Sequence, residues 1–190
     1  MDLGLRGKVA MVAASSKGLG FGIARELARE GALLALCARD ADGLAAAAAA
    51  LEADHGQPVL ALPCDLADET QIGGMVDAVL ARYGTVHVLV NNAGGPPPGP
   101  SARVSEADWQ RAFQLTLMSA VRTTSAVLPA MRAQRWGRIV NVSSYSVKQP
   151  IPDLMLSNSL RLAVAGWAKT LAAEVGPDNV LVNTVAPGWT

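Results

Sequence analysis

The amino-acid sequence predicts a doubly wound α/β fold with one parallel sheet, formed by a single domain over residues 1–190. Six short apolar runs alternate with amphipathic helical segments, and no internal repeat or flexible linker interrupts them. Polar or glycine-rich segments follow the strands, so they are expected to gather at the carboxyl edge of the sheet. Right-handed crossovers then place the helices on both faces.

The composition is that of a globular protein, with 51% hydrophobic and 17% charged residues. The 16 Lys and Arg residues balance the 16 Asp and Glu residues, so nothing in the net charge indicates nucleic acid or an anionic membrane as a partner. No uncharged apolar stretch reaches the roughly 20 residues of a membrane helix, and the N-terminus lacks the apolar core of a signal peptide. We therefore expect a cytoplasmic protein.

The cysteines and histidines do not predict a metal site. Cys37 and Cys64 lie in apolar, strand-like contexts, and their spacing is not that of paired metal ligands. His55 and His87 are equally isolated, and neither belongs to a recognisable ligand spacing. We expect two buried thiols and two histidines at the surface or at strand ends.

The alternation begins in residues 8–24. Residues 9–12 predict a buried strand, residues 15–20 a turn, and the apolar spacing after that turn predicts a helix. The backbone of such a turn can approach a pyrophosphate closely, and the start of the helix favours the phosphate charge. A purely structural glycine-rich turn is the alternative. The glycines concerned are Gly18, Gly20 and Gly22.

The next elements continue the pattern. Residues 32–38 predict a second strand, and residues 41–55 predict a helix because they contain six consecutive alanines. Residues 59–62 predict the third strand, and the helix after it ends at Tyr83-Gly84. Residues 86–90 predict a fourth, fully buried strand.

The second half begins with a proline-rich loop over residues 96–100. Ser105 and Asp108 predict a capping box at the start of a helix that continues to about Arg135. Residues 138–142 predict the fifth strand, followed by a polar loop over residues 143–152. Residues 153–175 then predict the last helix and residues 179–185 the sixth strand.

Six separate segments therefore end at one edge of the predicted sheet. In an open parallel sheet, a ligand binds in the crevice at this edge. The segments are the glycine turn, Arg39, Asp65, the loop after Asn91, Ser144 and the loop at Pro187.

These residues resemble the short-chain dehydrogenase/reductase family, particularly its branch similar to 3-oxoacyl-acyl-carrier-protein reductases. The resemblance covers the whole chain and implies the Rossmann fold. Its marks are residues 16–22 after the first strand, Asp65-Leu66 after the third, Asn91-Asn92-Ala93-Gly94 after the fourth, Asn141-Val142-Ser143-Ser144 at the end of the fifth, and Pro187-Gly188 after the sixth.

The resemblance also implies a set of cofactor-binding residues. Asp65 is expected to face the adenine, and residues 187–190 are expected to lie beside the nicotinamide. The full set is Ser15, Ser16, Lys17, Gly18, Leu19, Gly20, Arg39, Asp65, Leu66, Asn91, Ala93, Gly94, Arg161, Pro187, Gly188 and Thr190. Ala14 stands where the family usually has its first glycine.

The end of the second strand predicts NADP as the cofactor. Members selective for NAD usually carry an acidic residue there, which accepts hydrogen bonds from the ribose. Arg39 can instead pair with the 2′-phosphate of NADP, and Lys17 can reach the same charge. Asp40 follows directly, so NAD stays open as an alternative cofactor. A further alternative is that Arg39 is a solvated charge at the strand end with no role in cofactor binding.

The catalytic pattern departs from that of the family, in which a Tyr gives a proton, a Lys four residues later assists it, a Ser polarises the carbonyl and an Asn orders water. By position, these roles fall on Ser157, Arg161, Ser144 and Thr116, respectively. A serine hydroxyl is a much weaker acid than a phenol, and arginine can hold the ribose but cannot relay a proton.

Two nearby residues offer an alternative source of the proton. Tyr145 and Lys148 lie in the loop after the fifth strand, but they are three residues apart rather than four. The simpler interpretation is that they are ordinary loop residues.

The sequence also lacks what the family usually has after Pro187-Gly188, a helical lid and a final edge strand. We therefore expect a six-stranded sheet without that strand. The resemblance further implies a homodimer or homotetramer, with the helices over residues 107–135 and 153–175 at the interface.

The resulting hypothesis is an NAD(P)-dependent oxidoreductase that transfers hydride to or from a small carbonyl, an imine or an acyl-carrier-bound substrate. A protonated imine suits the residues best, because it accepts hydride without a tyrosine acid. Two alternatives stay open: a cofactor-binding subunit with little turnover, and a non-redox isomerase or cyclase. The sequence does not identify the substrate.

Overall fold

The computed structural model describes residues 2–188, in which six parallel strands form one sheet in the order β3-β2-β1-β4-β5-β6. All five neighbouring pairs are parallel, and the order reverses next to β1, which lies between β2 and β4. The predicted doubly wound fold is therefore confirmed. The strands are β1 (Val9–Val12), β2 (Leu33–Ala38), β3 (Leu60–Pro63), β4 (Val88–Asn91), β5 (Gly137–Val142) and β6 (Val180–Val185).

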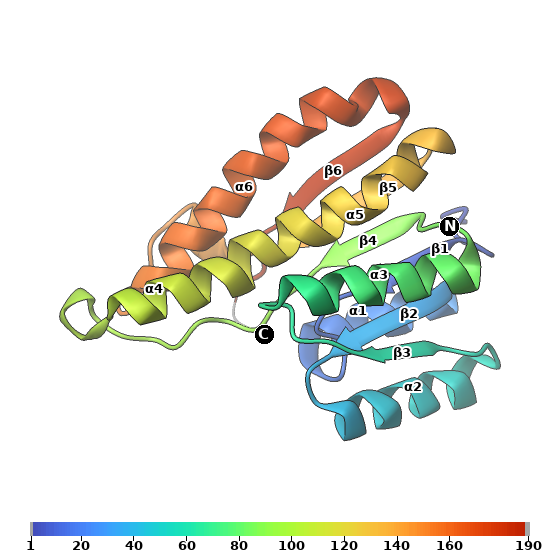
Figure 1. Cartoon of the computed structure of the whole chain (residues 1–190), viewed down its shortest axis with the longest axis horizontal. Helices are drawn as coiled ribbons and strands as arrows, with labels where there is room; N and C mark the ends of the chain where they lie inside the picture. The colour runs from blue at the N-terminus through green and yellow to red at the C-terminus, as the bar shows by residue number, and fades with distance from the viewer. Residues whose placement is uncertain (1, 189–190) are drawn as a thin grey trace.

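Helices cover both faces of the sheet (Figure 1). Helices α1 (Gly18–Arg29) and α2 (Ala41–His55) pack on one face, and α3 (Glu69–Tyr83), α5 (Ser119–Ala133) and α6 (Met155–Val175) pack on the other. The side chains of β1 alternate between the two cores, because successive residues of a strand point to opposite faces. Val9 and Met11 join the core under α3, while Ala10 and Val12 join the core under α1.

The helix ends follow from local side chains. Asp40 accepts a hydrogen bond from the N–H of Gly43 at the start of α2, and Asp68 caps α3 in the same way. Gly56 and Gly84 adopt the left-handed conformation that ends these two helices. The alanine-rich segment is thus a defined helix, as predicted.

The long helix before β5 is not uniform. It consists of α4 (Glu106–Ala112), a π-helical turn η2 (Phe113–Met118) and α5, whereas the sequence predicts one regular helix. The predicted capping box of Ser105 and Asp108 is present. The helix ends at Ala133 rather than near Arg135, because Arg135 has a φ of 50°. Figure 1 shows α4 extending beyond the sheet.

The loop predicted over residues 143–152 contains a short 3₁₀ turn, η3 (Tyr145–Val147), and α6 begins at Met155 rather than at residue 153. Asp153 has a φ of 60°, which helical residues do not adopt. The N–H of Gly99 donates to the carbonyl of Asp153 at 2.6 Å, so the proline-rich loop lies beside the segment before α6. Two further 3₁₀ turns are η1 (Ser101–Arg103) and η4 (Gly176–Asp178).

Both cysteines are buried free thiols, as predicted. Within residues 2–188, no group of His, Cys, Asp and Glu side chains is arranged to hold a metal ion. In the same part of the chain, no helix has the length and apolar character needed to cross a membrane.

Candidate active site

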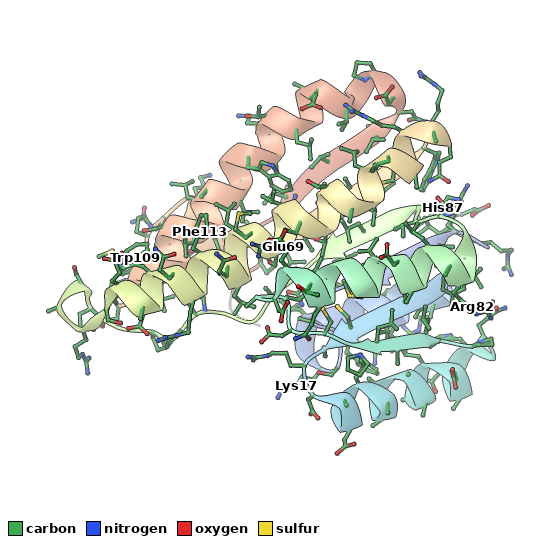
Figure 2. The ribbon with its side chains drawn as sticks, viewed as in Figure 1. Lys17, Glu69, Arg82, His87, Trp109 and Phe113 are labelled. Atoms are coloured by element: carbon green, nitrogen blue, oxygen red, sulfur yellow. The ribbon has the colours of Figure 1, made fainter. Side chains whose placement is uncertain are left out.

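A cleft of about 680 Å³ opens at the carboxyl ends of β1 to β4, and we call it the outer cleft. This volume lies within the range of small-molecule sites. Figure 2 shows Lys17 at this end of the sheet and His87 at the opposite end. The outer cleft is lined by Ala14, Ser16, Lys17, Leu19, Ala38, Arg39, Asp40, Cys64, Leu66, Asn92, Ala93, Gly94 and Leu115.

The turn after β1 is held from both sides. Ser15 is fully buried, and its hydroxyl donates to the carbonyl of Val12 at 2.9 Å. From the loop directly after β4, Nδ2 of Asn92 donates to the carbonyls of Ala13 and Ala14 at 3.3 and 3.2 Å. A Cβ on Gly20 would overlap the carbonyl of Ala14, so the tight turn requires glycine at that position.

The start of α1 is available to an anion. Lys17 is its N-cap residue, and no side chain caps the free N–H groups of the first turn. The first turn also has no acidic residue that would compensate the positive end of the helix. A helix start of this kind, reached through a glycine turn, binds phosphate groups.

Two exposed cations flank this helix start. Lys17 and Arg39 both line the outer cleft, and neither forms an ion pair within the described part of the chain. Asp40 lies beside them, but its carboxylate accepts the N–H of Gly43. The outer cleft therefore offers two unpaired positive charges to a ligand.

The segment after the third strand meets the outer cleft at some of its residues and not at others. Asp65 does not line the outer cleft, and its carboxylate accepts the N–H of Ala67 at 3.0 Å. Its neighbours Cys64 and Leu66 do line the cleft. Burial raises the pKa of the Cys64 thiol to about 11, so this thiol stays protonated at neutral pH.

A second space, which we call the inner cavity, adjoins the outer cleft and has a volume of about 20 Å³. The two spaces share Leu66, Asn92 and Ala93 as lining residues, so they are neighbours. The other lining residues of the inner cavity are Ala13, Asn91, Thr116, Ser119, Ala120, Thr123, Asn141, Val142, Ser143, Arg161 and Val164.

A buried polar network supports the inner cavity. Oδ1 of Asn91 accepts from the hydroxyl of Thr123 at 2.6 Å, and its Nδ2 donates to Oγ1 of Thr124 and to Oδ1 of Asn141, both at 3.0 Å. Asn141 in turn donates to the carbonyl of Asn183 at 3.4 Å. The network links β4, α5, β5 and β6 below the site.

Arg161 is half-buried and is held inside the protein by three hydrogen bonds. Its Nη1 donates to the carbonyls of Val142 and Ser143 at 3.1 and 3.2 Å, and its Nε donates to Oγ of Ser157 at 3.2 Å. Burial lowers the pKa of the guanidinium. The hydroxyl of Ser157 is buried in this contact, so it does not occupy the place of an exposed phenol.

Of the remaining predicted catalytic positions, one lines the inner cavity and the other lines neither space. Thr116 lines the inner cavity from the π-helical turn. Ser144 lines neither space, and its Oγ accepts the N–H of Ser146 at 3.2 Å at the start of η3. Tyr145 and Lys148 also line neither space. The structure thus brings Thr116, Ser157 and Arg161 together, and Ser144 follows directly after Ser143 of the cavity wall.

The end of β6 completes the predicted site residues. The carbonyl of Pro187 accepts the N–H of Tyr145 at 2.9 Å, which holds the chain after β6 against η3. Gly188 is the last described residue, and Thr190 lies outside the described residues.

The predicted set omits several residues that build the site. Asn92 fixes the glycine turn, and Asn141 and Ser143 line the inner cavity. Each belongs to a sequence mark given above, so the motifs contained a signal for them. Ser119 and Thr123 lie inside a helix, where no local pattern distinguishes them from other small polar residues.

Comparison with known proteins places these features in a family. The profile described as "short chain dehydrogenase" matches residues 8–190. Ketoacyl reductase 1 of the granaticin polyketide synthase from Streptomyces violaceoruber is 38% identical over 183 residues, which are 95% of this chain and 67% of that protein. The 3-oxoacyl-[acyl-carrier-protein] reductase FabG of Chlamydia muridarum is 34% identical over 182 residues, which are 96% of this chain and 73% of that protein.

Solved structures agree. L-sorbose reductase from Gluconobacter frateurii, complexed with NADPH and L-sorbose, has a TM-score of 0.96 and 37% identity over 99% of this chain and 72% of that one. A metagenomic short-chain oxidoreductase in complex with NADP has a TM-score of 0.92 and 35% identity over 98% of this chain and 84% of that one. An NAD⁺-bound xylitol dehydrogenase also has a TM-score of 0.92, at 28% identity over 97% of this chain and 71% of that one. The fold alone therefore accommodates either cofactor.

Proposed function

The chain belongs to the short-chain dehydrogenase/reductase family of NAD(P)-dependent oxidoreductases, and we propose that it uses NADP(H) to reduce a carbonyl or an imine. The observation that carries the cofactor preference is the pair of unpaired cations, Lys17 and Arg39, beside the uncapped start of α1. A guanidinium and an ammonium together match the extra 2′-phosphate that distinguishes NADP from NAD. NAD is the alternative cofactor.

The residues present fit a dinucleotide. The free N–H groups of α1 would hold the pyrophosphate, Arg39 and Lys17 the 2′-phosphate, and the loop over residues 91–94 the wall beyond it. Bound nicotinamide supplies the hydride.

Ser144 is the residue proposed to polarise the reacting group. Its Oγ accepts the N–H of Ser146, so its own hydrogen can be donated to a carbonyl oxygen. Arg161 keeps its proton and does not act as an acid, because a guanidinium is not deprotonated in proteins. The proton therefore comes from water, from the substrate or from Tyr145, and an already protonated imine needs none.

Consumption of NADPH tests the proposal. The protein is mixed with NADPH and a panel of ketones, imines and 3-oxoacyl thioesters, and the nicotinamide absorbance is followed. We expect oxidation with at least one class, and a loss of about a hundredfold to a thousandfold in rate for Ser144→Ala. Full activity of Ser144→Ala would remove Ser144 from the mechanism.

The burial of Ser157 against Arg161 favours a second candidate, a cofactor-binding subunit with little turnover. Tight NADPH binding without oxidation by any substrate class would support this candidate over the reductase. The double substitution Ser157→Tyr with Arg161→Lys restores the usual family pair. A rate increase in that variant would mean that the crevice is still arranged for carbonyl reduction.

A homodimer or homotetramer is part of the proposal. Large apolar side chains are exposed on the π-helical turn and on α6. They are Phe113, Met155 and Leu162, with 36%, 40% and 55% of their surface accessible. Figure 2 shows Phe113 on the helical arm that extends beyond the sheet. Light scattering of the purified protein measures the mass, and a monomer at all concentrations would contradict this part.

A further inference from the structure

A third space, which we call the α1 groove, lies between α1 and the segment before β1 and has a volume of about 720 Å³. This volume is within the range of small-molecule sites. Among residues 2–188, the α1 groove shares one lining residue, Leu19, with the outer cleft and none with the inner cavity. It is therefore a separate space that the proposed reaction does not use.

A stripe along α1 forms most of one wall of the α1 groove. Its residues follow the spacing i, i+3, i+4, i+7, i+8 and i+11, which places them along one side of a helix. The side of α1 that packs against the sheet is a different one, with buried small residues at Gly20, Ala24 and Ala28. The stripe consists of Leu19, Gly22, Ile23, Glu26, Leu27 and Glu30.

The segment before β1 forms the opposite wall with Leu3 and Leu5. The N–H of Gly7 donates to the carbonyl of Gly31 at 2.9 Å, which holds this segment beside the end of α1. Leu3 is 54% exposed and Leu19 is 42% exposed, so both walls present a large apolar side chain to water. Apolar side chains that gather in a concave surface favour an apolar ligand.

Both charged residues of the α1 groove are acidic, and one of them lacks a cation. Glu26 pairs with Arg29 at 2.9 Å. Glu30 is half-buried and forms no ion pair within residues 2–188, even with Arg6, whose side chain lies beside Gly31. Glu30 also directly follows α1, whose C-terminal end carries partial negative charge. A positive charge at Glu30 is therefore favoured by the carboxylate and by the helix.

We propose that the α1 groove binds a small amphiphilic cation, an ammonium group on an aliphatic chain. The ammonium donates hydrogen bonds to the carboxylate of Glu30, and the chain lies along the apolar stripe toward Leu19. At 1.5 Å per residue, this stripe is about 16 Å long, which accommodates an extended chain. Anionic amphiphiles are excluded by the two acidic residues. The site is independent of the cofactor and of turnover.

Three probes with the same eight-carbon chain test the site without any nicotinamide. Octylamine, which is protonated at pH 7, octanol and octanoate are titrated into the protein and followed by calorimetry or ligand-observed NMR. We expect saturable octylamine binding, octanol binding at least about tenfold weaker, and no saturable octanoate binding, because charge-assisted hydrogen bonds are stronger than neutral ones.

Glu30→Gln isolates the role of the charge. This variant should weaken octylamine binding about tenfold and leave octanol binding unchanged. It removes a negative charge from the negative end of α1, so it should fold at least as well as wild type. Asp54→Asn is the matched control, since Asp54 is an exposed carboxylate near the end of α2, outside the α1 groove and without an ion pair among residues 2–188. It should bind all three probes as wild type does.

Gly22→Leu tests the position of the chain. An added Cβ on Gly22 would meet no atom within 4 Å, so a leucine side chain fits there and fills the middle of the α1 groove. Leucine also favours a helix more than glycine does, so the variant should stay folded. We expect the affinities for octylamine and for octanol both to fall at least about tenfold.

Four results would overturn the inference. They are no saturable octylamine binding, equal affinities for octylamine and octanol, unchanged octylamine affinity in Glu30→Gln, and unchanged octylamine affinity in a folded Gly22→Leu variant. A titration at two protein concentrations tests the alternative occupant, a second copy of this chain. Octylamine affinity that falls as the protein concentration rises would mean that a second copy covers the α1 groove, and would also contradict the proposal.

Discussion

In the half of the crevice formed by β1, β2 and α1, the polar groups are left open: the start of α1 has no side-chain cap, and Lys17 and Arg39 make no ion pair within residues 2–188. In the half formed by β5 and α6, Arg161 donates to Val142, Ser143 and Ser157. The first half presents its charge to a large outer cleft, and the second encloses its charge beside a small inner cavity. The two halves therefore select different parts of a ligand.

The largest expected effect comes from a substitution in the open half of the crevice, the half formed by β1, β2 and α1. Gly20→Ala places a Cβ against the carbonyl of Ala14 and 2.9 Å from Nδ2 of Asn92. We expect NADPH affinity to fall at least about a hundredfold and unfolding free energy to fall by about 3 kcal/mol. Gly22→Ala is the matched control, because its Cβ meets no atom within 4 Å and it should bind NADPH nearly normally. Titration of NADPH fluorescence and urea unfolding measure both effects, and equal behaviour of the two variants would refute this account of the turn.

The next effect concerns the network below the enclosed half. Asn91→Ala removes three hydrogen bonds, so Oγ1 of Thr124 and Oδ1 of Asn141 lose this partner, whereas the hydroxyl of Thr123 can still donate to the carbonyl of Ser119 at 2.7 Å. We expect a loss of about 2–3 kcal/mol in unfolding free energy. Asn183→Ala should change stability by less than about 0.5 kcal/mol, since the Asn183 side chain is exposed and only its backbone carbonyl joins the network. A similar loss in both variants, measured by urea unfolding, would contradict the importance of the network.

At the end of the sheet opposite the crevice, His87 makes the stability of the folded protein depend on pH without taking part in either half of the site. Nδ1 of His87 accepts the N–H of Val9 at 3.0 Å, and burial, together with the charge of Lys8, lowers the pKa of His87. The folded protein therefore binds this proton less readily than the unfolded chain does. The contribution of His87 to stability is complete above pH of about 6.5 and is lost as the pH falls through the lower folded pKa.

Urea unfolding between pH 5 and pH 8, in wild type and His87→Gln, isolates this contribution. The variant should lack this part of the pH dependence, while its NADPH affinity at neutral pH stays unchanged. An identical pH dependence in both proteins would mean that His87 does not contribute. A changed NADPH affinity would mean that the two ends of the sheet are coupled.

The smallest expected effect is stabilising. Ala14 has a φ of 48°, a region that glycine adopts at little cost, so Ala14→Gly relieves strain and should raise the unfolding free energy by about 0.5 kcal/mol. Ala13→Gly is the control, because Ala13 is buried and has no positive φ, and it should lose about 1 kcal/mol. Thermal unfolding distinguishes the two signs. A loss of stability in Ala14→Gly would show that the methyl group matters more than the backbone.

Much of the fold could be predicted because β1 and β2 are continuous apolar runs and α2, α3 and α4 have side-chain caps at their starts. β1 has the predicted bounds, whereas β4 begins at Val88 instead of residue 86. The reason is a tertiary contact. The carbonyl of Val86 accepts a hydrogen bond from Nε2 of Gln134, which follows the end of the long helix. The π-helical turn was also missed, because the same apolar spacing is compatible with an uninterrupted helix.

The site could be predicted in part. The position of Lys17 and Arg39 at the outer cleft could be predicted, because both follow directly from the predicted strands and need no packing partner to be exposed there. The sequence identifies Arg161 as a substitution, but its hydrogen bonds go to backbone carbonyls at the end of β5, a contact that only the packing of α6 on the sheet creates. The unpaired hydroxyl of Ser143 and the position of Ser144 at the start of η3 depend on the same packing.

The most direct test of the open half, and of the cofactor assignment, is the pair of dissociation constants for NADPH and NADH, measured by fluorescence titration for wild type and Arg39→Asp. We expect wild type to bind NADPH at least about tenfold more tightly than NADH, because one charge-assisted hydrogen bond to the 2′-phosphate is worth roughly 1.5–3 kcal/mol. Arg39→Asp should abolish or invert this preference. Binding of NADH by the wild-type protein with equal or greater affinity would contradict the account.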